Sequence, residues 1–422
     1  MEPHSGSQRL YQRSWFRIAF LILLQNLVAI ALSRMIVGPS IFVASTAVSS
    51  ELSSTLLMAS CASIGAFYMA KQLVQFPGST IAVYFPLCVI LNFLVLAFLV
   101  VVFRLDYSRI ALVCSLLGAL LWILVDYNLP GGRSPLTVAV VPSGNLRDIS
   151  ELPKIDLALM KNPNDHPVRL DLVVADLYHD HDPVWETYIA KCVLAGIPVF
   201  DVKGLIERLT GRVEIEHLSE NSFGALLPSK FYLRLKYLID VTVSILLFPL
   251  VMAIIFAAAI FIRLETPGPV FFKQSRVGYR GHPFVIYKLR SMKVAATGAA
   301  FTAENDSRIT RVGAFIRRYR IDELPQIINV IRGEMSWIGP RPEAEELSSW
   351  YAKEIPYYIY RHAVRPGVTG WAQVVQGNVA EIDDVTRKLH YDFYYLKNFS
   401  AYLDLMIVFR TVYTLLSGFG SK

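Results

Sequence analysis

The chain has 422 residues, of which 54% are apolar and only 18% are charged. This composition argues against a purely water-soluble enzyme and predicts that long stretches of the chain lie in a lipid bilayer. The 41 basic residues outnumber the 34 acidic residues, and the net charge of +7 suits an anionic lipid surface or phosphorylated substrates. The four cysteines suggest neither a disulfide framework nor a CxxC metal site.

Four apolar stretches occur in the first 130 residues, each near the roughly 20 residues that a spanning helix needs. They are Trp15–Ser33, Leu52–Ala70, Thr80–Phe103 and Ile110–Val125. The first is better interpreted as a retained anchor than as a signal peptide, because no small-residue cleavage site follows it. The apolar stretch Met35–Ser50 would join or lengthen a helix. We therefore expect residues 1–130 to form an α-helical bundle with four crossings.

The charges beside these stretches predict their orientation. Arg9, Arg13 and Arg17 outnumber the lone Glu2 before the first stretch. Because basic residues accumulate on the cytoplasmic side, the N-terminus is predicted to be cytoplasmic. Four crossings would then return the chain to the cytoplasm near Arg133.

Residues 131–225 alternate short β-rich runs with a helical pattern. The β-rich runs are Leu136–Val141, Leu170–Val174 and Ile197–Val202, and the helical pattern is Pro183–Ala195. The alternation predicts a small Rossmann-like α/β domain in the cytosol. Its first strand runs into Pro142-Ser143-Gly144-Asn145 rather than GxGxxG, so a dinucleotide cradle is not evident and a structural or regulatory role is favoured.

The same domain contains the cluster His179-Asp180-His181-Asp182. A DxD pair with two imidazoles offers ligands for a metal ion. The cluster also lies between a strand and Pro183, where a solvated loop is expected. We favour the solvated loop.

Val241–Ile262 is an apolar run of 22 residues without a charge. As a straight helix it would measure about 33 Å, which is long enough to span a bilayer. Basic residues dominate both flanks, however, and both flanks are therefore expected on the cytoplasmic side. Pro249 lacks a helix donor and bends the segment. We expect a kinked re-entrant hairpin over about 237–262, and a fifth spanning helix is the alternative.

Residues 263–320 carry twelve basic and three acidic side chains, which is a net charge of +9. Nucleic acid is disfavoured as a partner, because this basic stretch directly follows a membrane segment. Binding to lipid headgroups is the simpler explanation for any single one of these residues.

An acidic pair, Asp322-Glu323, follows this basic stretch and precedes Pro325. Pro325 fits the first turn of a helix that continues through Gln326 to Ile331. The positive end of that helix would favour ionised carboxylates and bound phosphate. For an isolated acidic pair, helix capping is the ordinary explanation.

Further motifs weaken that explanation when they are taken together. They are Thr266–Phe272, Tyr287–Met292, Asp322–Gln326, Gly339–Glu343 and Arg365–Trp371. In this order, and after the proline-bent segment, they resemble the bacterial sugar transferase family, the monotopic phosphoglycosyl transferases that start glycan assembly on a polyprenyl phosphate. The resemblance covers about residues 230–422. The four crossings and the α/β domain are similar to the larger members, which initiate exopolysaccharide, capsule or O-antigen repeat units.

The resemblance implies an α/β monotopic catalytic domain over residues 226–422 that includes the re-entrant helix hairpin. It implies transfer of hexose 1-phosphate from a UDP-hexose to undecaprenyl phosphate, with release of UMP. Asp322 matches the family nucleophile, which would form a covalent aspartyl-phosphosugar. Glu323 matches its dyad partner. Mg²⁺ is the implied cofactor, bound at Asp322 and Glu323, although which of them binds it directly is left open.

The resemblance also implies roles for basic residues. Arg317 and Arg341 match positions that bind phosphate, since a guanidinium engages two phosphate oxygens at once. Lys288 and Arg290 match a KxR motif that would neutralise developing charge, or else contact lipid headgroups. Phe248 departs from many relatives, which have a small hydroxyl residue before the hairpin proline, Pro249 here.

The location and partners follow from the same resemblance. It implies a multi-pass protein of the bacterial inner membrane with its active site at the cytoplasmic face, where membrane lipids are partners. A homodimer is expected. Glucose and galactose are the leading sugars, but the motifs do not identify the sugar, and neither the glycan pathway nor the role of the α/β domain can be read from the sequence.

Aromatic residues mixed with Lys and Arg are dense downstream. They are Trp350, Tyr351, Tyr357, Tyr358, Tyr360, Tyr391, Phe393, Tyr394 and Tyr395. Such residues favour the headgroup layer. The following stretch, Leu403–Leu416, is interrupted by Asp404 and Arg410, so it is too short and too charged to span. It is expected either on the membrane surface or as an amphipathic helix packed on the catalytic core.

Two other classes of function stay open. One is a metal-dependent glycosyltransferase that uses Asp180 and Asp182 and releases UDP. The other is a non-catalytic membrane scaffold or sensor, which predicts that Asp322→Ala keeps function. No GxxxxGK[ST] loop or GxSxG turn occurs, which disfavours P-loop ATPases and α/β hydrolases.

Overall fold

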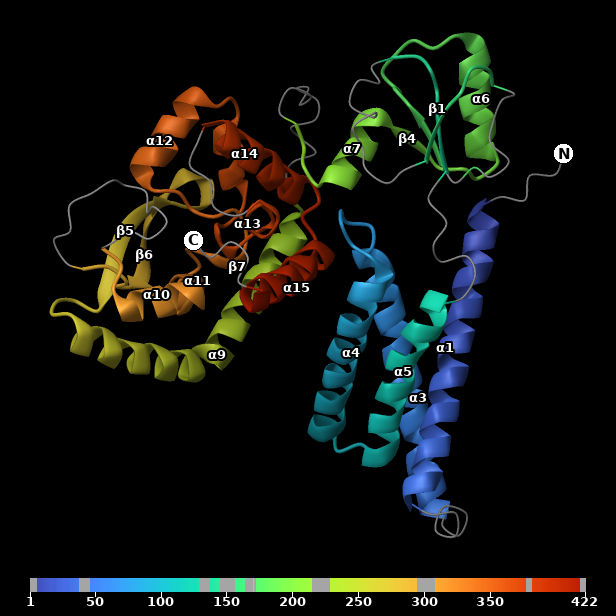
Figure 1. Ribbon diagram of the computed structural model, residues 1–422, viewed down its shortest axis with the longest axis horizontal. Helices are drawn as coiled ribbons and strands as arrows, with labels where there is room; N and C mark the ends of the chain where they lie inside the picture. The colour runs from blue at the N-terminus through green and yellow to red at the C-terminus, as the bar shows by residue number, and fades with distance from the viewer. Residues whose placement is uncertain are drawn as a thin grey trace. The chain divides into compact units, whose positions relative to one another are not determined.

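The computed structural model describes residues 6–37, 46–128, 137–144, 156–163, 170, 172–214, 228–293, 308–376 and 382–417 (Figure 1). Contacts divide the chain into two compact units, Met1–Gly211 and Arg212–Lys422. Residues Glu2, Arg133, Leu136 and Asn145 lie outside the described residues, as do residues 38–45 of the stretch Met35–Ser50 and the side chains of Arg9 and Arg13.

The first unit begins with long apolar helices. They are α1 (Gly6–Val37), α3 (Thr46–Leu73), α4 (Ile81–Phe103) and α5 (Arg109–Asn128). Among the described residues, these four and α9 (Lys230–Glu265) are the helices long and apolar enough to cross a membrane. The four predicted stretches are therefore confirmed as candidate spans, and the chain is a membrane protein.

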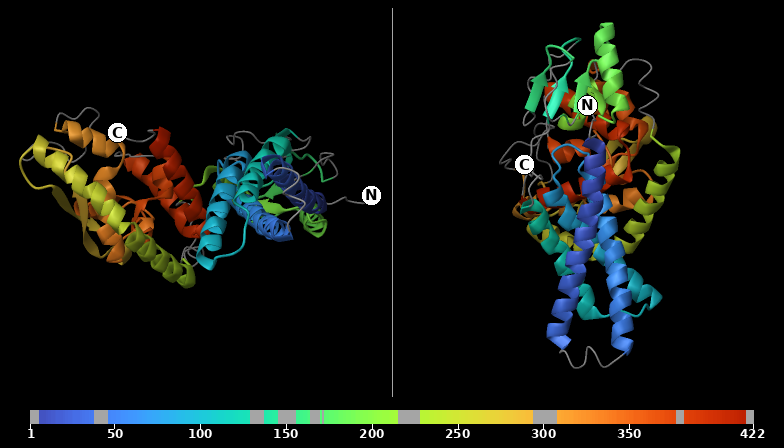
Figure 2. Two further views of the ribbon diagram at one scale, coloured as in Figure 1. Left: turned by 90° about the horizontal axis from the view of Figure 1, so that it is seen from below. Right: turned by 90° about the vertical axis from the view of Figure 1, so that its right-hand side faces the viewer.

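Close contacts hold the four N-terminal helices together (Figure 2). A Cβ on Gly118 would lie only 2.9 Å from the Gln25 Cα, so α5 packs directly against the backbone of α1. Arg17 pairs with Asp126 at 2.9 Å, which joins the beginning of α1 to the end of α5. The bundle therefore begins and ends on the same side, as an even number of passes requires.

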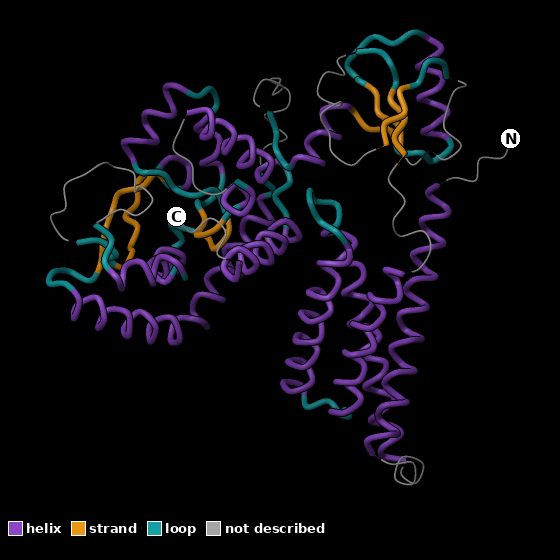
Figure 3. The backbone as a smooth tube through the Cα atoms, in the orientation of Figure 1, coloured by secondary structure: helices purple, strands orange, loops and turns teal. Residues whose placement is uncertain are grey.

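The first unit also contains a four-stranded parallel sheet (Figure 3). Its strands are β1 (Thr137–Val140), β2 (Asp156–Leu159), β3 (Leu172–Ala175) and β4 (Val199–Asp201), in the order β2-β1-β3-β4. Helix α6 (Pro183–Leu194) buries Trp185 and Cys192 against one face. Helix α7 (Val202–Thr210) buries Leu205 against the other. This α/β region has apolar residues on both faces of its strands because helices cover both.

The second unit combines α9 with short strands and helices. Its strands are β5 (Phe271–Val277) and β6 (Pro283–Leu289), which are antiparallel, and β7 (Ser336–Ile338) and β8 (Gly367–Thr369), which are parallel. Its other helices are η4 (Tyr279–Gly281), α10 (Arg311–Arg318), η5 (Ile321–Gln326), α11 (Ile327–Ile331), α12 (Glu345–Glu354), η6 (Tyr358–Ala363), α13 (Trp371–Val375), α14 (Ile382–Lys397) and α15 (Ala401–Ser417).

Helix α9 is one continuous helix that contains Pro249 and bends midway (Figure 1). Its buried positions recur every three, four or seven residues and form one stripe along the helix. They are Lys236, Asp240, Ser244, Val251, Ile255, Ala258 and Ile262. The halves before and after Pro249 thus pack on the same unit. Large apolar side chains elsewhere on the helix, such as Leu246 and Phe256, are exposed.

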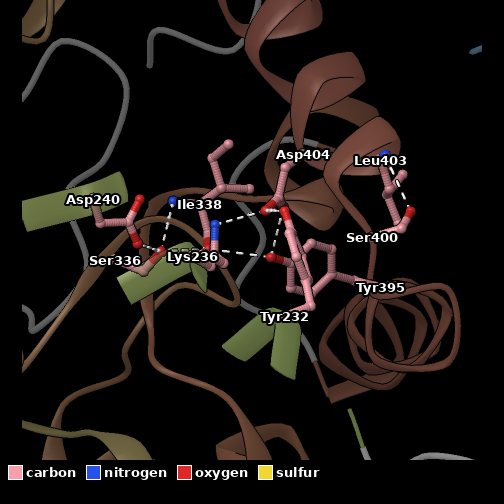
Figure 4. Close-up of polar contacts among 9 residues, drawn as sticks. All are labelled: Tyr232, Lys236, Asp240, Ser336, Ile338, Tyr395, Ser400, Leu403 and Asp404. Carbon is pink, nitrogen blue, oxygen red and sulfur yellow. Dashed lines mark hydrogen bonds and ion pairs between the residues drawn. The ribbon is translucent and has the colours of Figure 1, made fainter. Parts of the chain in front are cut away.

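The half of α9 before the proline is held by buried polar contacts (Figure 4). The Asp404 carboxylate accepts hydrogen bonds from the Tyr232 hydroxyl at 2.6 Å and the Tyr395 hydroxyl at 2.8 Å, and it pairs with Lys236 at 2.7 Å. Nearby, the Ser336 hydroxyl donates to Asp240 at 2.6 Å. These contacts tie α9 to α15 and to β7.

The other half of α9 is held by packing and by a helix cap. Ile255 and Ile262 pack in one core with Leu289, Ile316 and Ile327. At the end of the helix, the Glu265 carboxylate accepts hydrogen bonds from the first backbone N–H groups of α10, at 2.7 and 3.1 Å. A carboxylate in this position satisfies free donors and suits the positive end of the helix.

The C-terminal aromatic residues correct one expectation. Tyr351, Tyr358, Phe393, Tyr394 and Tyr395 are at most 3% exposed, so their predicted place in a headgroup layer is wrong. The Tyr351 ring packs against Tyr358, the Tyr394 ring against Trp371, and the Tyr395 ring against Phe399. Helix α15 likewise packs on the core, because Leu403, Met406 and Ile407 are fully buried. Of the two expectations for this stretch, the packed amphipathic helix is confirmed.

Helix α10 approaches the end of β6 so closely that only glycine fits. A Cβ on Gly313 would lie 2.0 Å from the Ser291 carbonyl oxygen. We expect Gly313→Ala to destabilise the protein by about 1–3 kcal/mol through overpacking. Gly204→Ala is the matched control, because a Cβ there meets nothing within 4 Å. In this helix interior it should stabilise by about 0.5–1 kcal/mol.

Unfolding in detergent, followed by circular dichroism, measures both changes. An unfolding temperature of Gly313→Ala at or above that of the wild type would contradict the close approach of α10 to Ser291.

Candidate active site

The acidic pair lies in a short 3-10 helix. Asp322 and Glu323 occupy its first turn, after Arg320 in the left-handed region with φ 56°. The helix begins at Ile321, before the predicted start near Pro325, because a 3-10 turn precedes α11. Both side chains are buried, with residue exposures of 9% and 5%. Two adjacent carboxylates are thus withdrawn from water.

Glu323 is held by basic side chains. One carboxylate oxygen, Oε1, lies 2.7 Å from the Lys288 amine and 2.7 Å from the Arg341 guanidinium. Arg320 lies 3.6 Å from the other oxygen. Burial by itself would raise the pKa of Glu323, but Arg341 and Lys288 hold that pKa well below its ordinary value. Glu323 therefore stays ionised and holds two cations beside the pair.

Asp322 is placed differently from its neighbour. Its Oδ1 atom is buried and has no hydrogen-bond partner among the described residues. Burial and the neighbouring Glu323 charge raise the pKa of Asp322 to about 6, although Lys288, Arg317 and Arg341 oppose the shift. Above this pKa the carboxylate is ionised, and its Oδ1 atom carries no hydrogen bond from the described residues.

Arg317 reaches the site from the end of α10. Its Nε donates to the Ser291 hydroxyl at 2.8 Å, and its charge lowers the pKa of Asp322. The close approach at Gly313 brings α10 to Ser291, and this explains the position of Arg317. Lys288, Arg317 and Arg341, predicted from separate motifs, are therefore gathered around the dyad.

Arg290 points elsewhere. Its terminal nitrogens donate to the Pro267 carbonyl at 3.0 Å and to the Thr266 carbonyl at 2.7 Å. These contacts brace the loop that follows α9. The structure therefore separates the two cations of the KxR motif, since only Lys288 contacts the acidic pair. A role for Arg290 in phosphate binding stays a prediction.

Arg341 lies in a loop that packs against the RPGVTGW motif. The Gly339 N–H donates to the Thr369 carbonyl, and the Gly367 N–H donates to the Pro340 carbonyl, each at 2.9 Å. A Cβ on Gly367 would lie 2.1 Å from the Gly339 nitrogen. The backbones of these two segments are therefore in direct contact. The two motifs thus form one structure that holds Arg341.

Several buried residues near the site were missed by the sequence analysis. Arg361, Lys388 and Asp392 form a charged cluster with Glu343, behind the loop of Arg341. Gln326 is 2% exposed, and its amide nitrogen has no partner among the described residues. Arg361, Lys388 and Asp392 are charged residues in segments rich in aromatic and apolar residues. Because an unpaired buried charge is costly, this pattern could have indicated that they form buried ion pairs.

Hydrogen bonds of His181 organise the His179–Asp182 loop. The two ring nitrogens of His181 contact the Ser143 hydroxyl at 2.6 Å and the Asp176 carbonyl at 2.8 Å. Asp180 and Asp182 are exposed. Among the described residues, no group of three or more His, Cys, Asp and Glu side chains is arranged to hold a metal. These contacts favour the loop interpretation over a DxD metal site.

The chain thus combines apolar helices long enough to cross a membrane with a buried carboxylate pair lined by cations. A family model described as bacterial sugar transferase matches residues 231–418. The chain is 46% identical over 322 residues to a UDP-N-acetylgalactosamine-undecaprenyl-phosphate N-acetylgalactosaminephosphotransferase of Aeromonas hydrophila, covering 76% of each chain. The protein therefore belongs to the bacterial sugar transferase family, which confirms the resemblance.

Other relatives match a smaller part of the chain. A UDP-glucose:undecaprenyl-phosphate glucose-1-phosphate transferase of Escherichia coli (strain K12) is 39% identical over 192 residues, or 44% of this chain and 41% of the relative. A putative undecaprenyl-phosphate N-acetylgalactosaminyl 1-phosphate transferase of Bacillus subtilis (strain 168) is 47% identical over 132 residues, or 31% of this chain and 74% of the relative.

The environment of Asp322 predicts a pH-dependent effect of its neutralisation. Because its pKa is raised, the folded chain keeps this proton up to about pH 6, whereas an unfolded chain releases it near pH 4. Ionised Asp322 therefore costs stability as the pH rises through this window, and the full cost applies above it. Asp322→Asn removes that cost.

We expect Asp322→Asn to raise the unfolding temperature at pH 7.5, measured in EDTA, and to change it little near pH 4. The low-pH measurement is the internal control for the substitution itself. A gain at pH 4 as large as the gain at pH 7.5 would contradict the raised pKa.

Proposed function

We propose that the protein transfers a sugar 1-phosphate from a UDP-sugar to undecaprenyl phosphate and releases UMP, with Asp322 as the nucleophile. One observation carries this proposal: Asp322 has an oxygen without a partner among the described residues, while Glu323 beside it holds two cations at 2.7 Å. The names of the relatives from Aeromonas hydrophila and Escherichia coli support the donor and the acceptor.

The proposed reaction consists of two displacements at one phosphorus atom. In the first, an Asp322 oxygen attacks the phosphorus that carries the sugar, and the bond from this phosphorus to the oxygen of UMP breaks. UMP leaves with the bonding electrons. In the second, a phosphate oxygen of undecaprenyl phosphate attacks the same phosphorus, and the Asp322 carboxylate departs. The covalent intermediate divides a reaction between two anions into two steps.

The cations around the dyad make an attack by one anion on another feasible. Lys288 and Arg341 neutralise Glu323, and their positive charges also lower the pKa of Asp322. Arg317 contributes a third charge on the Asp322 side. We propose that Arg341 and Arg317 bind phosphate oxygens of the donor, since fixed positive charges stabilise charge that develops during phosphoryl transfer.

The donor atoms present fit Mg²⁺ bound together with substrate. Mg²⁺ prefers oxygen ligands and commonly takes one or two carboxylates plus phosphate oxygens. In this pair, Oε1 of Glu323 is already occupied by cations, and Oδ1 of Asp322 is the proposed attacking oxygen. We therefore propose that the remaining carboxylate oxygens of Asp322 and Glu323 would hold the ion. The ion would offset repulsion between the carboxylate and the diphosphate.

We propose that α9 is re-entrant and lies in the cytoplasmic leaflet of the bacterial inner membrane. Support comes from its two halves, which both pack on the catalytic unit, through Lys236 with Asp404 and through Ile262 with Leu289. A spanning helix would separate these contacts by a hydrocarbon core of about 30 Å. The exposed apolar face of α9 would be covered by lipid. This placement brings the active site to the headgroups, where a soluble nucleotide sugar and a lipid phosphate meet.

The sugar is proposed from the comparisons. The relative that matches 76% of both chains is named for N-acetylgalactosamine, whereas the glucose transferase of Escherichia coli matches 44% of this chain. We propose UDP-N-acetylgalactosamine as the first donor to test, before UDP-glucose and UDP-galactose. The glycan pathway and the homodimer stay predictions.

The first test is a labelling experiment. Incubation with Mg²⁺ and a UDP-sugar radiolabelled in the sugar should label the wild-type protein, and Asp322→Asn should carry no label because an amide is a poor nucleophile. Asp180→Asn is the matched control in the other acidic cluster and should be labelled fully. An Asp322→Asn protein that accumulates the adduct would exclude Asp322, and release of UDP instead of UMP would favour the DxD alternative.

The second test addresses the membrane helix. In a chain without native cysteines, Ser229→Cys and Thr266→Cys flank α9, and both should react with a membrane-impermeant thiol reagent from the cytoplasmic side only. Asp106→Cys, between α4 and α5, is the control and should react from the opposite side. Reaction of the two α9 positions from opposite sides would show that α9 spans.

A further inference from the structure

A cluster of buried charges lies against the loop of Arg341. Glu343 pairs with Lys388 at 2.6 Å, and Arg361 pairs with Asp392 at 2.8 Å. The two pairs are joined because the Arg361 guanidinium also lies 3.8 Å from Glu343. The side chains of Arg361 and Asp392 are both 2% exposed, so the cluster is part of the interior.

A cluster of buried ion pairs is not explained by a gain in folding stability. Removing charges from water is costly, and a buried ion pair often stabilises a protein no more than well-packed apolar residues would. Buried ion pairs do impose direction, because each partner must meet a specific atom. The cluster is therefore better explained by its contact with a neighbouring group whose position it fixes.

That group is the backbone of Arg341. One terminal nitrogen of Arg361 donates to the Arg341 carbonyl oxygen at 2.9 Å, and the other donates to the Tyr358 hydroxyl at 2.9 Å. The planar guanidinium has several donors in fixed directions, so it donates to the carbonyl and the hydroxyl together while its charge pairs with Asp392. A lysine at this position has one nitrogen and cannot reproduce the arrangement.

The neighbouring residues of the loop are fixed as well. Pro340 and Pro342 restrict the backbone on either side of Arg341. The Pro340 carbonyl accepts from Gly367, and the Glu343 carbonyl accepts from Val277. With its backbone held in this way, Arg341 extends its guanidinium to Glu323 at 2.7 Å.

We propose that Arg361 is a positioning residue for the reaction proposed above, and that it acts through Arg341 alone. It holds the main chain of Arg341 so that the guanidinium lies beside the Asp322–Glu323 pair, where donor phosphate is bound. The terminal nitrogens of Arg361 are engaged by the Arg341 carbonyl, the Tyr358 hydroxyl and the Asp392 carboxylate, so they are committed to protein partners. This inference rests on the proposed function, because its readout is sugar-phosphate transfer.

The test is a double-mutant cycle on Arg361 and Arg341, measured by single-turnover release of UMP from the full-length protein with UDP-N-acetylgalactosamine, UDP-glucose or UDP-galactose, whichever is turned over. We expect Arg361→Met to lower the rate about 10- to 100-fold in the wild type, because small displacements of a catalytic group have effects of this size. In the Arg341→Ala background, Arg361→Met should lower it by less than about 3-fold. If Arg341→Ala is too slow to measure, the same cycle is applied to the equilibrium affinity for UMP.

Lys236→Met is the matched control, since Lys236 is another buried cation in an ion pair, with Asp404. Lys236→Met should change the rate of UMP release by the same factor in the wild type and in the Arg341→Ala background. An effect of Arg361→Met that is also the same in both backgrounds would overturn the proposal and leave Arg361 a general structural residue.

A conservative variant keeps the proposal testable if Arg361→Met fails to fold. Arg361→Lys keeps the charge opposite Asp392 but loses the fixed pair of donors, so it should fold and still transfer at least about 10-fold more slowly. A folded Arg361→Lys enzyme with the wild-type rate would overturn the proposal. A wild-type protein that releases no UMP from any UDP-sugar would instead refute the proposed function.

Discussion

Two adjacent buried carboxylates are the constraint on which the catalytic unit depends. Burial penalises both ionised forms, and the two charges repel each other. The conflict is resolved unequally, because Glu323 receives Lys288 and Arg341 at 2.7 Å, whereas the Oδ1 atom of Asp322 receives no partner among the described residues. The pair therefore contains one carboxylate that organises cations and one with an oxygen that carries no hydrogen bond from the described residues. Identical chemical groups acquire different roles from their surroundings alone.

The membrane helix α9 supports this pair directly. Its buried face packs on Leu289, Ile316 and Ile327, which adjoin Lys288, Arg317 and the end of the 3-10 helix that carries the dyad. The segments that carry Lys288, Arg317 and the dyad thus pack on the same hydrophobic core as α9. A change in how α9 packs would be transmitted to all of them, since a packed interior does not deform freely.

Two clusters of buried charges fix the positions of α9 and of the loop of Arg341 more narrowly than apolar packing does. Asp404 collects Lys236 and two tyrosine hydroxyls at the beginning of α9 (Figure 4). Arg361, with its partners, holds the loop of Arg341. Apolar contacts tolerate small shifts, but a buried charge without its partner is costly, so each cluster selects one arrangement. One cluster locates the membrane helix, and the other locates a cation of the site.

The sequence by itself determined the four N-terminal apolar helices, the acidic pair, and the basic motifs that mark the family, because length, hydropathy and short motifs are properties of neighbouring residues. Only the tertiary structure decided that Lys288 contacts Glu323 while Arg290 braces a loop. It also decided that Tyr358 and Tyr395 are core residues and that Arg361 supports Arg341. These outcomes depend on contacts between distant positions, up to 172 residues apart for Tyr232 and Asp404. Local patterns show that a side chain is charged or aromatic, but packing determines which partner it meets.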